Sequence, residues 1–271
     1  MDLTILIILL ISGLFVGFIN TLSAGGTVIS IALYLALGLP ATAANATNRI
    51  NVLIQSFGTS YIMYRQGLLE IKKVFKYSLP TLIGAIIGSV FAVSISNNLF
   101  SYFLGIVLII MIFFLFFKPT NFHNDDEEKI SRKTPLFHYL IFFLIGIYGG
   151  FIQVGTGFYL MIAGVSLIGY NILRTNALKV AIMFIYSIAS ILVFMTSSEI
   201  YWSYGIIHSI GAVIGSWFAT RYAMKKGTKF VNYVIIAVII LTALNLFGII
   251  DLKDFFFKFN LNEIPFKSFL S

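Results

Sequence analysis

The chain has 271 residues, of which 59% are hydrophobic and only 10% are charged, with a formal net charge of +8. A soluble domain carries about 25% charged residues, so this composition excludes an ordinary water-soluble protein and indicates a helical membrane protein. The absence of cysteine excludes disulfides, thiolate metal sites and cysteine nucleophiles. We interpret the excess of lysine and arginine as a mark of cytoplasmic loops, and we expect no nucleic-acid partner.

Apolar segments follow one another along the chain, five in each half. They span 3–22, 27–39, 50–64, 77–95 and 99–117, then 137–154, 157–170, 179–197, 204–220 and 230–250. Most approach the roughly 20 residues that cross a bilayer, but 27–39 and 157–170 are short enough to be half-helices or re-entrant segments. The sequence predicts an all-α, polytopic protein of about 8 to 10 transmembrane segments in the cytoplasmic (inner) membrane.

The two halves resemble each other. Three pairs of stretches match in the same order: GFIN (17–20) with GFIQ (150–153), ATNRINVLIQS (46–56) with ALKVAIMFIYS (177–187), and IGAIIGSVFA (83–92) with IGAVIGSWFA (210–219). Such self-similarity indicates an internal duplication. We therefore expect a first transmembrane repeat (1–117), a cytoplasmic linker (118–135), a second transmembrane repeat (136–250) and an interfacial C-terminal tail (251–271).

Loop charges predict that the repeats cross the membrane in opposite directions. The loop at 65–76 carries four basic residues, whereas its counterpart at 196–204 carries only Glu199; the next pair is reversed, with no charge at 93–98 and four basic residues at 221–229. Basic loops face the cytoplasm, so equivalent loops lie on opposite sides. Inverted repeats with interrupted short segments at matching places are typical of secondary transporters.

The interruptions are polar and rich in glycine: NTLSAGG (20–26) in the first half and QVGTG (153–157) in the second. Non-helical backbone at membrane depth is tolerated only where protein buries it or where it lines a cavity. We expect helices to begin after these glycines and to direct free N–H groups at an anion. Two pairs of glycines with GxxxG spacing, Gly84/Gly88 and Gly211/Gly215, are expected to pack helices closely.

No acidic residue lies within a predicted spanning segment, which argues against a cation or proton carrier. The embedded polar groups are neutral or basic and suit an oxyanion. They are Asn20, Thr21, Ser23, Thr47, Asn48, Arg49, Asn51, Gln55, Gln153, Thr156, Asn176 and Lys179.

Each prominent candidate has a second interpretation. Arg49 falls in a segment expected to be an outer or re-entrant loop. Its side chain either contacts the ligand or has another role, as a helix cap or a contact with lipid headgroups. Lys179, expected in a cytoplasmic loop, binds the ligand or reports orientation. Asn20 and Gln153 bind the ligand or hydrogen-bond a neighbouring helix. His208 carries a proton or hydrogen-bonds a neighbouring helix.

The stretch GFINTLSAGG…GLPATAANATNR resembles the first-repeat signature of the TauE/SafE (sulfite exporter, DUF81) family of membrane transporters, and GGFIQVGTG to RTNALKVA resembles the second. The resemblance implies transport of sulfur-containing anions such as sulfite or organosulfonates. With Arg49 from the polar inventory, the substrate-binding residues are expected to be Asn20, Gly25, Gly26, Thr47, Asn48, Arg49, Gln153, Gly155, Gly157 and Lys179.

The leading hypothesis is a secondary transporter, in the direction of export, for small sulfur-containing anions. The alternative is an anion channel or a permease for a non-sulfur organic anion. We expect no enzyme activity, because no nucleophile with a base and no metal cluster can be assembled from these residues. No cofactor and no metal are expected. The expected partners are the small anion and the lipid bilayer, and association into a homo-oligomer stays open.

Overall fold

The computed structural model describes residues 3–23, 25–116, 135–196, 199–223 and 240–250. Within these ranges the chain forms helices and no strand. The helices are α1 (Leu3–Ser23), α2 (Thr27–Ala36), α3 (Ala41–Arg65), α4 (Ile71–Ser94), α5 (Asn97–Phe116), α6 (Leu136–Phe151), α7 (Thr156–Ala163), α8 (Ile172–Phe194) and α9 (Trp202–Phe218), with π-helical segments η1 (Gly164–Ile168) and η2 (Ala219–Ala223). The expected linker lies almost wholly, and the tail at 251–271 wholly, outside the described residues; of the segment expected at 230–250, residues 230–239 lie outside them.

Three of the described helical segments are long and apolar enough to cross a membrane: Leu3–Thr21, Ile71–Ser94 and Ile172–Phe194. Several others are apolar but shorter, among them α2 and α6. The 25-residue α3 is long enough, but it carries many polar side chains. The expectation of a helical membrane protein is therefore confirmed.

Several helices begin earlier than the apolar pattern predicts, and in two of them the difference changes the place of a candidate residue. We expected 41–49 and 172–178 to be loops, but α3 begins at Ala41 and α8 begins at Ile172. Alanine-rich sequence favours the helix after Pro40, and the side chain of Asn171 accepts a hydrogen bond of 2.9 Å from the Arg174 backbone N–H as an N-cap. The loop placements of Arg49 and Lys179 were therefore wrong, and both residues lie inside helices.

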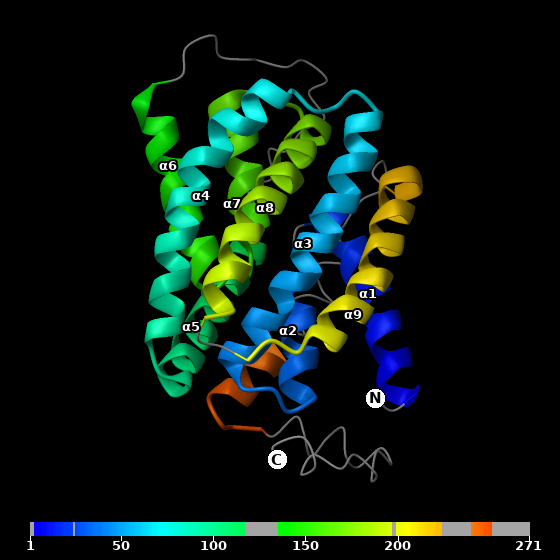
Figure 1. The fold of residues 1–271 in the computed structure, drawn as a ribbon, viewed down its shortest axis with the longest axis vertical. Helices are drawn as coiled ribbons and strands as arrows, with labels where there is room; N and C mark the ends of the chain where they lie inside the picture. Colours follow the sequence, from blue (N-terminus) through cyan, green and yellow to red (C-terminus); the bar gives the residue numbers. More distant parts are fainter. Residues whose placement is uncertain (1–2, 24, 117–134, 197–198, 224–239, 251–271) are drawn as a thin grey trace.

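The long helices stand side by side and run in two opposed directions (Figure 1). In that view α1, α3 and α9 run upward, whereas α4, α6 and α8 run downward. The most extensive packing is of α4 along α6 and of α1 along α9, and α3 contacts α8 between these pairs. The two central helices, α3 and α8, carry the buried polar residues from which a site can be built.

Glycines allow the paired helices to approach closely. A Cβ at Gly17 in α1 would collide with the carbonyl of Ala212 in α9, and a Cβ at Gly150 in α6 would collide with the carbonyl of Ala85 in α4. The predicted packing role of the GxxxG glycines is confirmed, because the same kind of backbone contact occurs at Gly84, Gly88, Gly211 and Gly215. The contacts of the α1–α9 pair recur in the α4–α6 pair at positions that the sequence match relates.

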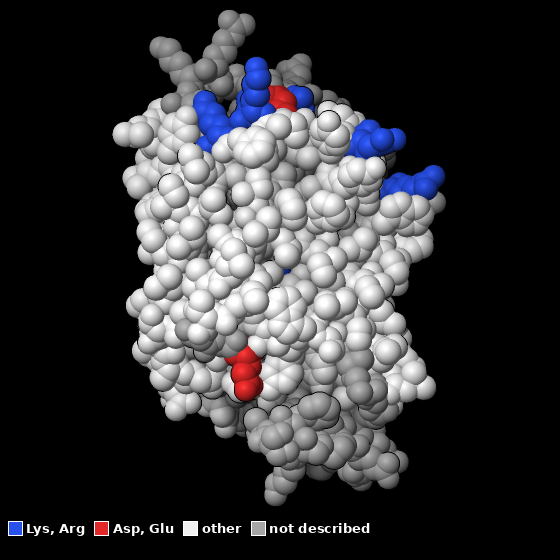
Figure 2. Space-filling view, viewed as in Figure 1, with Lys and Arg blue, Asp and Glu red and all other residues white. Residues whose placement is uncertain are grey.

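Basic side chains gather at one end of the molecule (Figure 2). There Glu70 accepts two ion pairs, from Lys73 at 3.3 Å and from Arg174 at 3.3 Å. Partial burial acts to raise the pKa of Glu70, but hydrogen bonds from Tyr170 and Lys73, with the charges of Lys73 and Arg174, outweigh it and hold the pKa below its usual range. This cluster joins the α3–α4 connection to the start of α8.

Candidate functional site

A small polar cavity lies between α1, α3 and α8, close to the first residues of α2 and α7. The centre of a water molecule can move within about 20 Å³ of this cavity, so the cavity holds about one or two water molecules. A larger ligand therefore requires the surrounding helices to move apart. The lining residues are Asn20, Thr21, Thr27, Gln55, Ser56, Thr59, Gly157, Lys179, Val180 and Met183.

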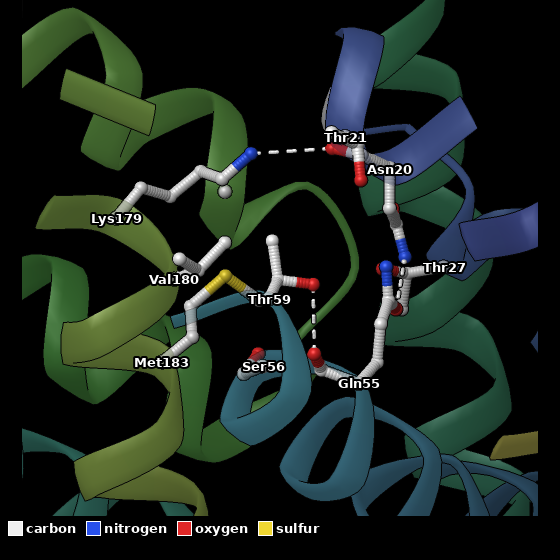
Figure 3. A pocket seen from close by; sticks show the side chains of 10 residues that line it. Asn20, Thr21, Thr27, Gln55, Ser56, Thr59, Lys179, Val180 and Met183 are labelled. Atoms are coloured by element: carbon white, nitrogen blue, oxygen red, sulfur yellow. Dashed lines mark hydrogen bonds between the residues drawn. The ribbon is translucent and has the colours of Figure 1, made fainter. Parts of the chain in front are cut away.

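Lys179 supplies the positive charge of this cavity. Its side chain extends from α8 toward the end of α1 (Figure 3), and its Nζ donates a hydrogen bond of 3.2 Å to the backbone carbonyl of Asn20. The residue is 3% exposed, and it forms no ion pair within the described part of the chain. A buried ammonium with one neutral acceptor is incompletely compensated, so it favours an anion beside it.

Amide and hydroxyl groups form the opposite wall. The Nδ2 of Asn20 donates to Oε1 of Gln55 at 3.1 Å, and Nε2 of Gln55 donates to Oγ of Ser216 at 2.9 Å. Ser216 Oγ donates in turn to the carbonyl of Gly17 at 3.1 Å. This series of hydrogen bonds fixes the Gln55 amide between α1 and α9. In Figure 3, Asn20 and Gln55 lie together on the side of the cavity opposite Lys179.

Arg49 has a different role from Lys179. It is fully buried, and its guanidinium donates to the carbonyls of Gly149, Gly150 and Phe151, the last residues of α6. It also lies over the ring of Phe194, 4.2 Å from the ring centre. The carbonyl end of a helix carries partial negative charge, so Arg49 caps α6 electrostatically and by hydrogen bonds. The helix-cap interpretation of Arg49 is the one that these contacts support.

The break between α6 and α7 is shaped by two residues with left-handed backbone. Gln153 has φ 66° and Gly155 has φ 76°. Glycine adopts this conformation freely, but a glutamine there carries strain that its surroundings must compensate. The Gln153 side chain is fully buried, and neither its Oε1 nor its Nε2 has a hydrogen-bond partner. A strained, unpaired amide at a helix break is typical of a functional position.

The other predicted residues are distributed around these two places. Gly25 and Gly26 form the turn into α2, where a Cβ on Gly26 would lie 2.6 Å from the carbonyl of Val16. Thr47 accepts a hydrogen bond of 3.1 Å from the Tyr201 backbone N–H, so its hydroxyl is engaged in joining α3 to α9. Asn48 is fully buried without a partner for either amide atom.

Six of the ten predicted residues lie in one of two places. Asn20, Gly157 and Lys179 line the cavity, whereas Arg49, Gln153 and Gly155 lie at the end of α6 and the start of α7. As the sequence predicts, α2 begins directly after its glycine-rich stretch, whereas α7 begins at Thr156, within QVGTG and after Gly155.

His208 is held by neighbouring helices. Its ring nitrogens lie 3.2 Å from Ser12 Oγ and 3.1 Å from Ser30 Oγ, and Asn51 donates to the same Ser30 hydroxyl at 3.3 Å. Of the two interpretations of His208, these contacts support hydrogen bonding between α1, α2, α3 and α9. They leave neither ring nitrogen unpaired.

Sequence reasoning placed Gln55 among the embedded polar residues but not in the site, and it overlooked Thr59 and Met183. One signal could have found Gln55: it lies seven residues after Asn48, on the same face of a helix, and in the same matched stretch. No group of three or more residues that could bind a metal occurs among the residues the structure describes.

Comparison with known proteins finds a family and relatives along most of the chain. The family model for sulfite exporter TauE/SafE matches residues 9–246. The chain is 28% identical over 243 residues to "Probable membrane transporter protein ORF9" of Sinorhizobium sp, covering 89% of this chain and 92% of that protein. It is 26% identical over 233 residues to "Probable membrane transporter protein" of Haemophilus influenzae, covering 86% and 90%. It is 22% identical over 222 residues to "Probable membrane transporter protein YfcA" of Escherichia coli K12, covering 82% of each.

No solved structure matches the chain. The family model covers most of the sequence, and it includes both glycine-rich breaks and both central helices. The chain therefore belongs to the sulfite exporter TauE/SafE family of membrane transporters.

Proposed function

We propose that the protein is a secondary transporter that exports small sulfur-containing anions, such as sulfite or organosulfonates, across the cytoplasmic membrane. The observation that carries the proposal is the buried ammonium of Lys179 in a polar cavity, without an ion pair among the described residues. Asn20 and Gln55 supply amide groups to the same cavity. An oxyanion with several acceptor oxygens fits this set of donors.

We also propose that repeats 1–117 and 136–250 have inverted topologies. Such a pair of repeats allows alternating access. The support for inverted topologies is the correspondence of contacts: Ser89 Oγ donates to the Gly150 carbonyl at 3.1 Å, and Ser216 Oγ donates to the Gly17 carbonyl at 3.1 Å. The matched stretches relate Ser89 to Ser216 and Gly17 to Gly150. The opposed directions of α1 and α6 add to this support. One repeat rocking against the other then exposes the cavity to each side in turn.

The direction of export has an electrical reason. A membrane potential that is negative inside favours exit of an anion by about 2.3 kcal/mol per charge per 100 mV. The basic end of the molecule faces the cytoplasm in this arrangement, since basic loops stay on that side. This charge raises the local concentration of anions at the entrance.

The test is efflux of radiolabelled sulfite from proteoliposomes containing the purified protein. Unlabelled organosulfonates, sulfate and carboxylates serve as competitors. We expect saturable efflux that a sulfonate competes with and that shows counterflow. Transport of carboxylates alone would support the alternative, a permease for a non-sulfur organic anion. Flux that neither saturates nor shows counterflow would indicate a channel.

A further inference from the structure

A second group of buried polar side chains lies beside the end of α6, and the cavity around Lys179 does not include it. Gln153, Asn48 and Tyr186 are all fully buried, and both amides and the Tyr186 hydroxyl lack a hydrogen-bond partner. A buried polar group without a partner costs about 1–3 kcal/mol. Several such groups on neighbouring elements indicate a place for a polar ligand.

Contacts with the break between α6 and α7 bring Gln153 and Tyr186 together. Asn48 lies in α3 between Asn45 and Arg49, which both donate to carbonyls at the end of α6. The Tyr186 hydroxyl lies near Gln153 and Thr156 without a hydrogen bond of ordinary geometry to either. A Cβ on Gly149 would lie 3.3 Å from that hydroxyl oxygen, so the glycine leaves room for it. The Thr156 hydroxyl donates a hydrogen bond of 2.9 Å to the Gln153 carbonyl, and this bond holds the break in place.

The electrostatic environment of this group favours a negative ligand. Arg49 is fully buried beside it, and the charge of Arg49 acts on Tyr186. Its Nη atoms bind the carbonyls at the end of α6, but its Nε remains without a partner. The acidic residues within the described ranges are Glu70 and Glu199. Both lie in connections between helices, Glu70 before α4 and Glu199 before α9, and not inside the helix bundle. A cation bound here would have Arg49 as its nearest charge.

The sequence match gives this group a counterpart in the cavity. At the offsets of the matched stretches, Asn48 corresponds to Lys179, Tyr186 to Gln55, and Gln153 to Asn20. Along α3, Asn48 lies seven residues from Gln55, about 10 Å on the same face. The two groups of polar residues are thus close. Each combines two residues of one half of the chain with one residue of the other half, and the halves change places between the two groups.

We propose that Gln153, Tyr186 and Asn48 form a second binding site for the transported oxyanion, which the anion occupies before or after the cavity of Lys179. The inference rests on the proposed function, since it takes the same ligand. Arg49 supplies the electrostatic attraction while it stays bound to α6, and the two amides and the phenol supply hydrogen bonds. The anion exchanges between two sites that are built alike, so neither needs to bind it tightly.

Anomalous diffraction from crystals of the full chain soaked in selenite tests the proposal. Selenite resembles sulfite in shape and charge, and the absence of cysteine removes the thiols that would reduce it. We expect two selenium peaks, one beside Lys179 and one among Gln153, Tyr186 and Asn48. A single peak beside Lys179 overturns the second site and leaves the proposed function standing. Absence of both peaks overturns the two proposals together.

Two conservative variants add a functional readout. Tyr186→Phe removes only the unpaired hydroxyl, so we expect loss of the second peak, an unchanged first peak and a sulfite efflux rate reduced at least 10-fold. Tyr34→Phe is the matched control, because Tyr34 is also fully buried with an unpaired hydroxyl but lies against His208. We expect it to keep both peaks and the parental rate. Equal rates in the two variants would overturn the second site.

Discussion

Replacement of Lys179 by methionine separates binding of the anion from folding. Methionine keeps an unbranched side chain of similar length and removes the buried ammonium. A hydrogen bond to a charged group contributes about 1.5–3 kcal/mol. Since about 1.4 kcal/mol corresponds to a factor of ten, we expect the apparent affinity for sulfite to fall about 10- to 150-fold.

The same substitution should leave the fold intact. It removes the hydrogen bond from Nζ to the Asn20 carbonyl, which is worth about 1.5–3 kcal/mol because the donor is charged. It also removes the cost of burying a charge, which is at least as large. We therefore expect the melting temperature in detergent to be equal to that of the parent or higher.

Initial rates of sulfite counterflow at varied concentration, with thermal unfolding in detergent, measure both effects. Lys72→Met is the matched control, because it removes the same charge from an exposed position at the start of α4. The control should retain the parental KM. If Lys179→Met folds and transports with the KM and maximal rate of the parent, Lys179 does not bind the anion.

Three further predictions concern the fold around the site. Arg49→Met removes three hydrogen bonds to the carbonyls at the end of α6, although Ser89 still donates to Gly150 and Asn45 to Phe151. A thermal melt in detergent should therefore show a loss of stability of about 1–3 kcal/mol, and an unchanged melting temperature would contradict the capping role. Gly150→Ala places a Cβ on a backbone carbonyl and should reduce the yield of folded protein, whereas Gly58→Ala meets only a valine side chain at 3.2 Å and should be tolerated in the same expression assay. The lowered pKa of Glu70 means that its stabilising effect is present above pH about 4.3 and is lost as pH falls through the lower folded-state pKa. Melting temperatures from pH 7 to pH 3 should show a small acid-dependent decrease that Glu70→Gln reduces, small because the ion pairs are partly exposed to solvent.

Features that depend on local sequence were predictable. An apolar composition with few charges determines that the chain resides in a membrane, and glycine-rich stretches after apolar runs determine where α2 and α7 begin. The packing role of Gly84 and Gly211 followed from their spacing, since small residues four apart let backbones approach. The resemblance of the motif GFINTLSAGG identified the family that the family model then matched.

The tertiary structure decided which polar residues share a site. Arg49 and Lys179 appear alike in the sequence, as single cations in polar stretches expected to be loops. Arg49 meets the carbonyls of residues 149–151, about one hundred positions away, and its charge is engaged there. Lys179 meets a single carbonyl of α1 and faces a cavity. The sequence alone determined which polar and basic side chains lie within the membrane, because the apolar segments around them must be buried in it. Only the packing of α6 and α1 against α3 and α8 determined which cation is held by the carbonyls at a helix end and which faces the cavity.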